Sequence, residues 1–336
     1  MNLEKAKNIS IIFIAIVLFG TLLIKFESWM RPFAISLILS FLITPLYRVT
    51  GKKKIKTYLK IFGITLIILG LLIGLGVILY QGAKTFIASN IDTEASLTEK
   101  FETLSIQFGN YKLMLKDYIN IDEVSKIAGD IINKIVNFSS TIVTEISTII
   151  LFLLFLLPTL NVWIKNASKN KGTKSSQYLK IFTDLETGIR DYLKIKTIVS
   201  LGTGIISLIV LLIFGVKFAI VLATLIFLLN FIPSIGSIIA VMIALGVQFF
   251  NTGIDGKFIL LGGILITIQM IFGNYIEPKY TGNSLKLSPL IVILSLFFWG
   301  SIWGIGGMLF SVPFTLAIKI LLEHNKGTNF AAKKLE

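Results

Sequence analysis

The sequence predicts an all-α polytopic membrane protein with about six full transmembrane helices and two broken or re-entrant helical hairpins. Composition, segment length and charge distribution support this prediction. Of 336 residues, 54% are hydrophobic and only 15% are charged, and the mean hydropathy is +0.85. Soluble domains carry about 25% charged residues, so this apolar excess does not fit inside a soluble core. It excludes a soluble enzyme, a disordered chain and a coiled coil.

Six segments are apolar enough to cross a bilayer, which takes roughly 20 residues. They are 9–24, 32–47, 61–80, 142–164, 197–216 and 258–276. The first has a basic lead, as a signal peptide would. Charged Lys25 and Glu27 follow it without a small-residue cleavage site, so we expect a retained span.

Two longer apolar stretches, 218–250 and 288–322, are interrupted near their middles. Polar and helix-breaking residues interrupt the first at 230–237, and a glycine-rich run interrupts the second at 300–307. The arms of the first stretch are about 13 residues long and reach only about 20 Å. We expect hairpins that enter the membrane and return, or short tilted helices.

Charge distribution predicts the orientation, because cytoplasmic loops of membrane proteins are rich in Lys and Arg. Segment 48–60 holds six basic residues and no acid, and segment 165–196 holds eight basic and three acidic residues. Segment 81–140 holds six basic and eight acidic residues. Both termini are therefore predicted to be cytoplasmic. The net charge of +14 reflects this topology and not a nucleic-acid partner.

The polar segment 81–140 is predicted to be an extracytoplasmic insertion of amphipathic helices. Asn120 and Glu123 resemble a capping box, and apolar residues from Ile121 to Val136 then recur at helical spacing. We expect such a helix to pack on the membrane surface or on sister subunits, with substrate capture as the alternative. A second amphipathic stretch, 174–196, is predicted to be an interfacial cytoplasmic helix.

These segments divide the chain into five regions. They are N-terminal transmembrane helices at 1–80, the insertion at 81–140, a span with its cytoplasmic helix at 141–196, a transport core at 197–322, and a tail at 323–336. Within the core, a span followed by a broken stretch occurs twice, at 197–250 and 258–322. Because the two copies enter from opposite sides, an inverted-topology repeat is predicted, and such repeats form transporter sites at their interface.

No catalytic machinery, cofactor motif or metal-ligand cluster is apparent, so an enzyme is not predicted. The chain has no Cys, and its one histidine, His324, lies in the charged tail. The first candidate site is the break around Asn230, where a buried amide needs a partner or a ligand. Its members are Asn230, Pro233, Ser234, Gly236 and Ser237. Exposed carbonyls and hydroxyls there could bind a cation or a polar solute, and a self-satisfied structural kink is the alternative.

The second candidate site surrounds Glu277 at the end of the sixth span. Pro278 is expected to draw Glu277 out of helical geometry. An acid near hydrocarbon is costly, which makes it a candidate proton or cation group. An interfacial acid paired with Lys279 or Lys286 is the alternative.

The chain resembles the autoinducer-2 exporter family over about residues 180–320. The similar runs are Asn-Phe-Ile-Pro-Ser-Ile-Gly-Ser-Ile-Ile at 230–239, the run 274–285 with Glu277 and Pro278, Leu-Ser-Pro-Leu at 287–290, and the run from Gly304 to Pro313. Ser288 departs from the histidine that the family often has before Pro289. The resemblance extends the candidate pathway to Asn274, Gly282, Pro289, Gly304, Gly307 and Pro313.

The resemblance implies a multi-pass permease of the bacterial inner membrane that forms a homo-oligomer. Members of the family are linked to export of autoinducer-2, and others to sodium or lithium/proton antiport. The leading hypothesis is secondary export of a small polar solute. The alternatives are a Na⁺(Li⁺)/H⁺ antiporter with Glu277 as the coupling acid, and a non-transporting membrane scaffold.

Overall fold

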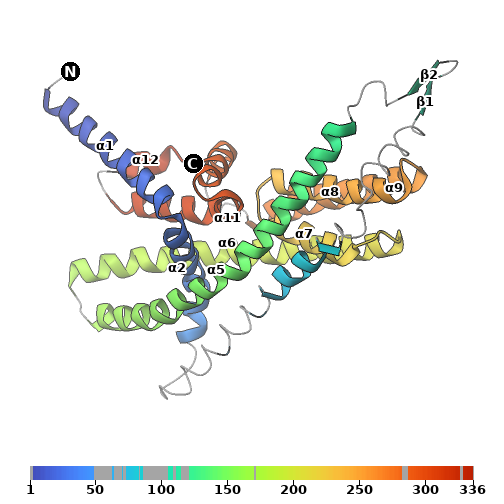
Figure 1. Cartoon of the computed structure of the whole chain (residues 1–336). Coiled ribbons are helices and arrows are strands. Elements are labelled where there is room, and N and C mark those ends of the chain that lie inside the picture. The colour runs from blue at the N-terminus through green and yellow to red at the C-terminus, as the bar shows by residue number, and fades with distance from the viewer. Residues whose placement is uncertain are drawn as a thin grey trace. The chain divides into compact units, whose positions relative to one another are not determined.

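The computed structural model describes residues 3–48, 63, 70, 73–82, 84–85, 105–108, 111–114, 121–169, 172–281, 287–325 and 328–335. Helices dominate this part of the chain (Figure 1). Four of its helices are long and apolar enough to cross a membrane: Glu145–Lys169, Ser175–Ile213, Gly256–Tyr280 and Pro289–Glu323. The predicted all-α polytopic membrane fold is therefore confirmed. The third predicted span, 61–80, lies mostly outside the described residues, although Ile73–Gly82 is helical.

The chain forms two compact units, each assembled from separate stretches of sequence. Unit 1 contains Met1–Ile61, Ser147–Asp191 and Leu285–Glu336, and unit 2 contains Phe62–Ile146 and Tyr192–Ser284. Two long helices, α5 (Ile121–Lys169) and α6 (Thr173–Ile213), contribute to both units. Each is one continuous helix that covers an amphipathic segment and a span, which the sequence predicts as two separate elements. The division of the chain into five regions stays a prediction.

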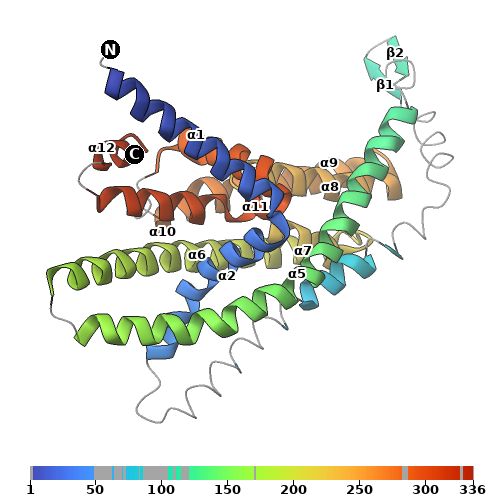
Figure 2. The same ribbon diagram turned by 60° about the vertical axis from the view of Figure 1, so that its left-hand side comes forward.

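Unit 1 is built around contacts between its N-terminal helices and the end of the chain. Helices α1 (Leu3–Lys25) and α2 (Glu27–Arg48) cover the first two predicted spans. Both contact α11 (Pro289–Glu323), as Figure 2 shows. The Trp303 indole donates a hydrogen bond to the Leu23 carbonyl at 3.2 Å. Arg31, which is ion-paired with Glu27, donates to the Trp303 carbonyl at 3.4 Å.

Helix α11 folds back on itself and confirms the predicted break in the second long stretch. Helical geometry is lost at Trp303 and Gly304, and Gly304 has a φ of 59°. The Trp299 indole donates to the Thr315 hydroxyl at 3.3 Å, which joins residues on opposite sides of the break. The rings of Trp299 and Phe314 also meet, with centroids 4.7 Å apart. Short α12 (Asn329–Lys333) packs against α11.

Unit 2 contains the other break, between α7 (Ala219–Leu229) and α8 (Ile235–Thr252). Ser234 has a φ of 58° and directly precedes the return helix, which begins at Ile235. Helix α8 packs against α7 and against α9 (Gly256–Met270), and Figure 1 shows α8 and α9 side by side. Leu222, Ile226, Ala244, Leu261 and Leu265 belong to the core among these helices and α6.

A glycine without space for a side chain follows each break. A Cβ on Gly236 would overlap the carbonyl oxygen of Leu229, across the turn between α7 and α8. A Cβ on Gly307 would overlap the carbonyl oxygen of Trp299, across the turn in α11. Both turns are therefore tight because glycine lets one backbone approach another.

The insertion 81–140 is not wholly helical, which corrects the prediction. Strands β1 (Ser105–Phe108) and β2 (Tyr111–Met114) form an antiparallel pair with Phe108 opposite Tyr111. The sequence contains the reason: polar and apolar residues alternate in Ser-Ile-Gln-Phe, and Gly109 and Asn110 are residues typical of a tight hairpin turn. Helix α5 begins at Ile121, directly after the predicted cap.

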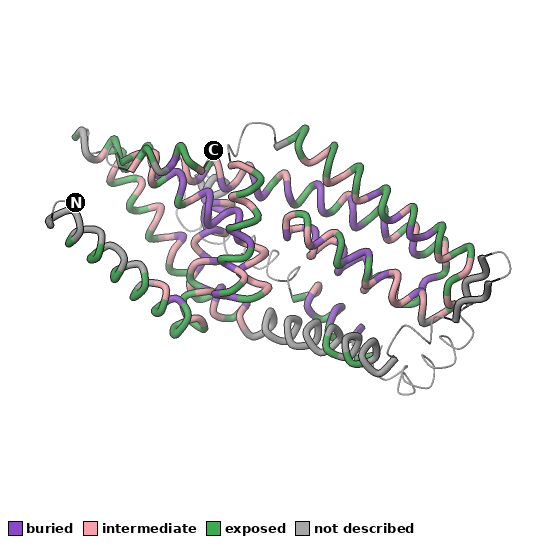
Figure 3. The backbone as a smooth tube through the Cα atoms, turned by 90° about the horizontal axis from the view of Figure 1, so that it is seen from above, coloured by how far each residue is buried: buried purple, intermediate pink, exposed green. Residues whose placement is uncertain are grey.

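Apolar side chains are exposed along the described helices. Figure 3 shows exposed residues recurring along the length of these helices. The exposed large apolar side chains include Leu212, Ile213, Phe297 and Phe298. A soluble protein would bury such a surface, whereas a bilayer solvates it.

Replacing Gly236 by Ala is expected to lower the free energy of unfolding by about 2 kcal/mol, because the new methyl group forces the turn open. Thermal unfolding of the purified protein in detergent would measure it. Gly246→Ala in the same helix is the control, because open space surrounds Gly246. Equal melting temperatures for the two variants would contradict the argument.

Candidate functional site

A row of polar side chains runs along one face of α6 within unit 2. Its members share burial and helical spacing, and they are Tyr192, Lys196, Ser200, Thr203 and Ser207. We call them the α6 polar row. Steps of three and four residues keep them on one face. At 1.5 Å per residue the row extends about 22 Å, a large part of the ~30 Å hydrocarbon core.

Two glycines let neighbouring helices approach α6 beside this row. A Cβ on Gly202 would lie 2.8 Å from the Phe272 ring, and one on Gly204 would lie 3.1 Å from the Cβ of Phe227. Phe227 belongs to α7 and Phe272 follows α9. The two predicted sites, around Asn230 and around Glu277, therefore both lie against α6 in unit 2.

Asn230, the centre of the first predicted site, contacts the middle of the α6 polar row. It is only 5% exposed, and its amide Nδ2 donates to the Ser200 Oγ at 3.0 Å. Asn230 ends α7, and its backbone N–H still bonds the Ile226 carbonyl. The amide is thus satisfied by a side chain on another helix, as a polar group buried in an apolar region requires.

Glu277, the centre of the second predicted site, reaches the same helix one turn away. Its Oε1 lies 2.6 Å from the Nζ of Lys196. The Lys196 side chain is 4% exposed and that of Glu277 is 24% exposed. The described partner of Glu277 is thus distant in sequence, whereas the sequence points to the nearby Lys279 or Lys286.

The prediction that Pro278 draws Glu277 out of helical geometry is wrong. Glu277 has φ −58° and ψ −51°, and it begins α10 (Glu277–Thr281). A π-helix, η2 (Ile271–Ile276), precedes it, and the Glu277 N–H bonds the Phe272 carbonyl five residues back. The wider π turn relieves the clash that a proline ring makes with an α-helix, so the chain continues through Pro278.

The other predicted residues of unit 2 lie in or near these turns. Pro233 and Ser234 form the turn after Asn230, and the Ser237 hydroxyl donates to the Ser234 carbonyl at 3.0 Å. The carbonyls of Leu228, Leu229, Ile232 and Pro233 accept backbone hydrogen bonds within the turn. Asn274 is exposed in η2, and Gly282 lies outside the described residues.

The predicted residues of unit 1 all belong to α11. Pro289 is its first residue, after Ser288, whose Oγ accepts from the Ile291 N–H at 3.3 Å. Gly304 and Gly307 form its fold-back turn, and Pro313 is buried beyond it. His324, for which no role is predicted, has Nε2 3.0 Å from the Asp184 Oδ2.

The α6 polar row is the part of the site that sequence reasoning missed. The signal was present, since Lys and hydroxyl residues recur every three or four positions from 192 to 207. Hydroxyl groups in apolar helices often bond their own backbone, as Thr203 does to the Val199 carbonyl. Ser207 differs, because its buried Oγ has no hydrogen-bond partner among the described residues.

The arrangement favours recognition of polar or charged groups. Over two turns of α6 it presents an ammonium, a carboxylate, an amide and two hydroxyls, in surroundings that are otherwise apolar. No group of three or more acidic or histidine side chains suited to a metal ion occurs among the described residues.

Comparison with known proteins places the chain among transporters. Residues 10–327 match the family described as "AI-2E family transporter". A candidate transport protein of Borreliella burgdorferi is 32% identical over 314 residues, covering 89% of this chain and 82% of that protein. The AI-2 transport protein TqsA of Escherichia coli is 41% identical over 139 residues, covering 41% of this chain and 40% of TqsA.

A double-mutant cycle tests the Lys196–Glu277 pair. Lys196→Met and Glu277→Gln are each expected to lower the free energy of unfolding by about 2 kcal/mol, because each leaves a half-buried or buried polar group without its partner. The double variant is expected to recover part of that loss. The more exposed Arg190–Asp191 pair is the control and should show coupling of about 0–1 kcal/mol. Additive losses at Lys196 and Glu277 would rule out the coupling.

Proposed function

We propose that this chain, which belongs to the AI-2E transporter family, exports a small polar solute by secondary transport. The family identifies a multi-pass membrane transporter, and the solute and the direction of transport are the proposal. The observation that carries it is the α6 polar row, which runs buried through an apolar helix and contacts both Asn230 and Glu277.

The proposed pathway follows this row. A solute with hydroxyl or carbonyl groups can exchange its hydration for hydrogen bonds with Asn230, Ser200 and Ser207. Each of these side chains can donate as well as accept. A nonpolar solute offers no such bonds and could not compensate for the separation of Asn230 from Ser200, which selects against it. Lys196 and Glu277 neutralise each other when the site is empty, so a net charge need not be buried.

The tight turns at Gly236 and Gly307 are proposed to be the moving elements. Both lie beside backbone that is already non-helical, at Ser234 and at Trp303 and Gly304, so a helix can change direction there without unwinding a regular turn. We assign the candidate pathway residues on α11 to a gate formed by the second of these moving turns. These residues are Pro289, Gly304, Gly307 and Pro313. The proposed inverted repeat of 197–250 and 258–322 agrees with a break in each half.

A second candidate function, Na⁺(Li⁺)/H⁺ antiport, is favoured by the Lys196–Glu277 pair alone. A carboxylate that contacts a buried ammonium can exchange this partner for a cation or accept a proton. Asn230 and the hydroxyls of the row would supply neutral oxygen ligands to the cation.

The orientation and assembly are part of the same proposal. Both termini are assigned to the cytoplasmic side of a bacterial inner membrane, with 81–140 outside. A homo-oligomer is proposed to cover some of the exposed apolar surface of the described helices. A non-transporting scaffold is the remaining alternative, and it requires no solute or ion flux.

Asn230→Ala is expected to reduce solute flux in proteoliposomes by about tenfold, because it removes the amide and leaves Ser200 unpaired. The screen would use a panel of small polar solutes that includes autoinducer-2. Thr224→Ala on α7 is the control, since among the described residues its hydroxyl bonds the Ile220 carbonyl of the same helix. Unchanged flux in Asn230→Ala at equal protein abundance would refute the site. No flux of any kind in the wild type would favour the scaffold.

Glu277→Gln distinguishes export from antiport. If the chain is an exporter, wild-type proteoliposomes show solute flux, and Na⁺ evokes no proton flux in them. If it is an antiporter, Na⁺-evoked proton flux appears and Glu277→Gln abolishes it. Glu323→Gln, which changes a carboxylate 3.6 Å from Lys319 in unit 1, is the matched control.

A further inference from the structure

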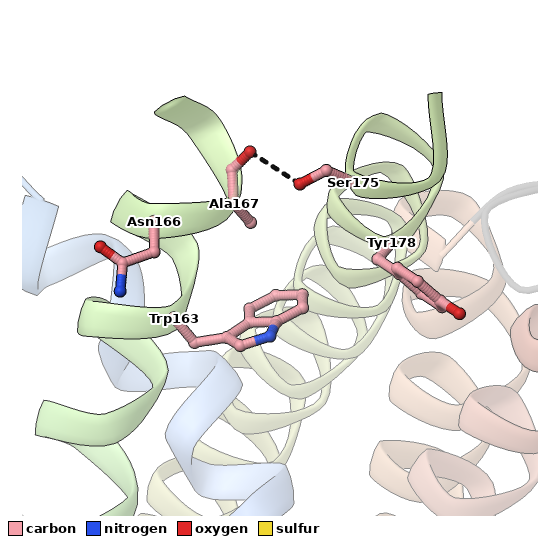
Figure 4. Close-up of a pocket in the computed structure, with 5 residues that line it drawn as sticks. All are labelled: Trp163, Asn166, Ala167, Ser175 and Tyr178. Atoms are coloured by element: carbon pink, nitrogen blue, oxygen red, sulfur yellow. Dashed lines mark hydrogen bonds between the residues drawn. The ribbon is translucent and has the colours of Figure 1, made fainter. Parts of the chain in front are cut away.

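The hairpin between α5 and α6 contains a pocket that the transport site does not use. It lies in unit 1, where the candidate span Glu145–Lys169 ends and the candidate span Ser175–Ile213 begins. The pocket has a volume of about 240 Å³. Its lining residues are Trp163, Asn166 and Ala167 from α5 and Ser175 and Tyr178 from α6 (Figure 4).

The lining combines polar groups with aromatic rings. The Ser175 hydroxyl donates to the Ala167 carbonyl at 3.0 Å and joins the two helices (Figure 4). The indole of Trp163 points from α5 toward α6 in the same view. Trp163 is 41% exposed and Tyr178 is 59% exposed. Half-exposed Trp and Tyr at the ends of spans are typical of the level of lipid headgroups.

The surrounding sequence is strongly basic. Between 165 and 180 it contains five lysines and no acid: Lys165, Lys169, Lys171, Lys174 and Lys180. Lys165, Lys169 and Lys180 are exposed. A cluster of four to eight basic residues directly beside a transmembrane helix attracts anionic lipids. This basic segment coincides with a pocket that has polar groups in its lining.

We propose that this pocket binds the phosphate headgroup of an anionic phospholipid. The lysines around the hairpin supply the charge, and Asn166 and Ser175 supply neutral hydrogen-bonding groups in the pocket. Trp163 and Tyr178 pack against the glycerol and upper acyl region. A lipid held there connects α5 to α6 at the membrane surface, next to their contact between Trp163 and Phe182, whose ring centroids are 5.6 Å apart.

Native mass spectrometry of the full-length protein in a neutral detergent tests the proposal. The probes are dioctanoyl phosphatidylglycerol, dioctanoyl phosphatidylcholine and inorganic phosphate. The wild type is expected to bind phosphatidylglycerol about a hundredfold more tightly than phosphatidylcholine, since each of the three exposed lysines contributes about fivefold. Inorganic phosphate alone is expected to bind weakly and not to displace the lipid.

Two kinds of variant separate a pocket from diffuse attraction. The triple variant Lys165→Gln, Lys169→Gln and Lys180→Gln should lose about a hundredfold in affinity for phosphatidylglycerol. The control removes the same charge elsewhere, with Lys7→Gln, Lys25→Gln and Lys333→Gln, all exposed residues of unit 1. Ala167→Leu fills the pocket and keeps every charge, and it should also lose the preference.

Asn166→Leu changes an exposed side chain and guards against a folding defect in Ala167→Leu. Equal binding of the two lipids by the wild type would overturn the proposal. Unchanged affinity for phosphatidylglycerol in both the triple variant and the pocket variants would also overturn it. Equal losses of this affinity in the triple variant and in its control would do the same. Phosphate that binds while phosphatidylglycerol does not would show a site for the free anion and would also overturn it.

Discussion

Hydrocarbon offers no hydrogen-bond partner, so every break in a helix at membrane depth must be satisfied by the protein itself. The fold of this chain can be understood from that constraint. Each long apolar stretch is interrupted once, and each interruption is closed by a glycine that lets backbone meet backbone, Gly236 against Leu229 and Gly307 against Trp299. The turn after α7 bonds its own carbonyls, and the turn in α11 is held by Arg31 and by the indole of Trp303.

The same constraint accounts for the α6 polar row. A buried amide, a buried ammonium and a partly buried carboxylate are each costly alone, and here they are compensated on one helix: Asn230 by Ser200 and Glu277 by Lys196. In the proposed transport function, a solute or a cation that offers equivalent bonds replaces one partner of such a pair. The pocket at the α5–α6 hairpin is different, because it lies where one candidate span ends and the next begins, and the neighbouring Lys165, Lys169 and Lys180 are exposed.

Helix breaks were predicted well where they depend on residues with strong local backbone preferences. Asn230, Pro233 and Gly236 predicted the break between α7 and α8, and the glycines at 300–307 predicted the fold-back of α11. Pro278 shows the limit of a local rule, because η2 widens the preceding turn and the helix continues. The hairpin Ser105–Met114 shows another limit: four-residue alternation is a weak signal beside the long helical periodicity that follows it.

The sequence by itself determined the membrane class, the positions of both breaks and the similarity to a transporter family. All of these depend on composition, on residues close together in the chain, or on direct comparison of residues. Only the tertiary structure decided that Glu277 meets Lys196 and that Asn230 meets Ser200. The physical reason is that 81 and 30 residues separate these partners. A hydroxyl in an apolar helix has the same sequence signature whether it bonds its own backbone or a neighbouring helix, and packing alone selects between the two.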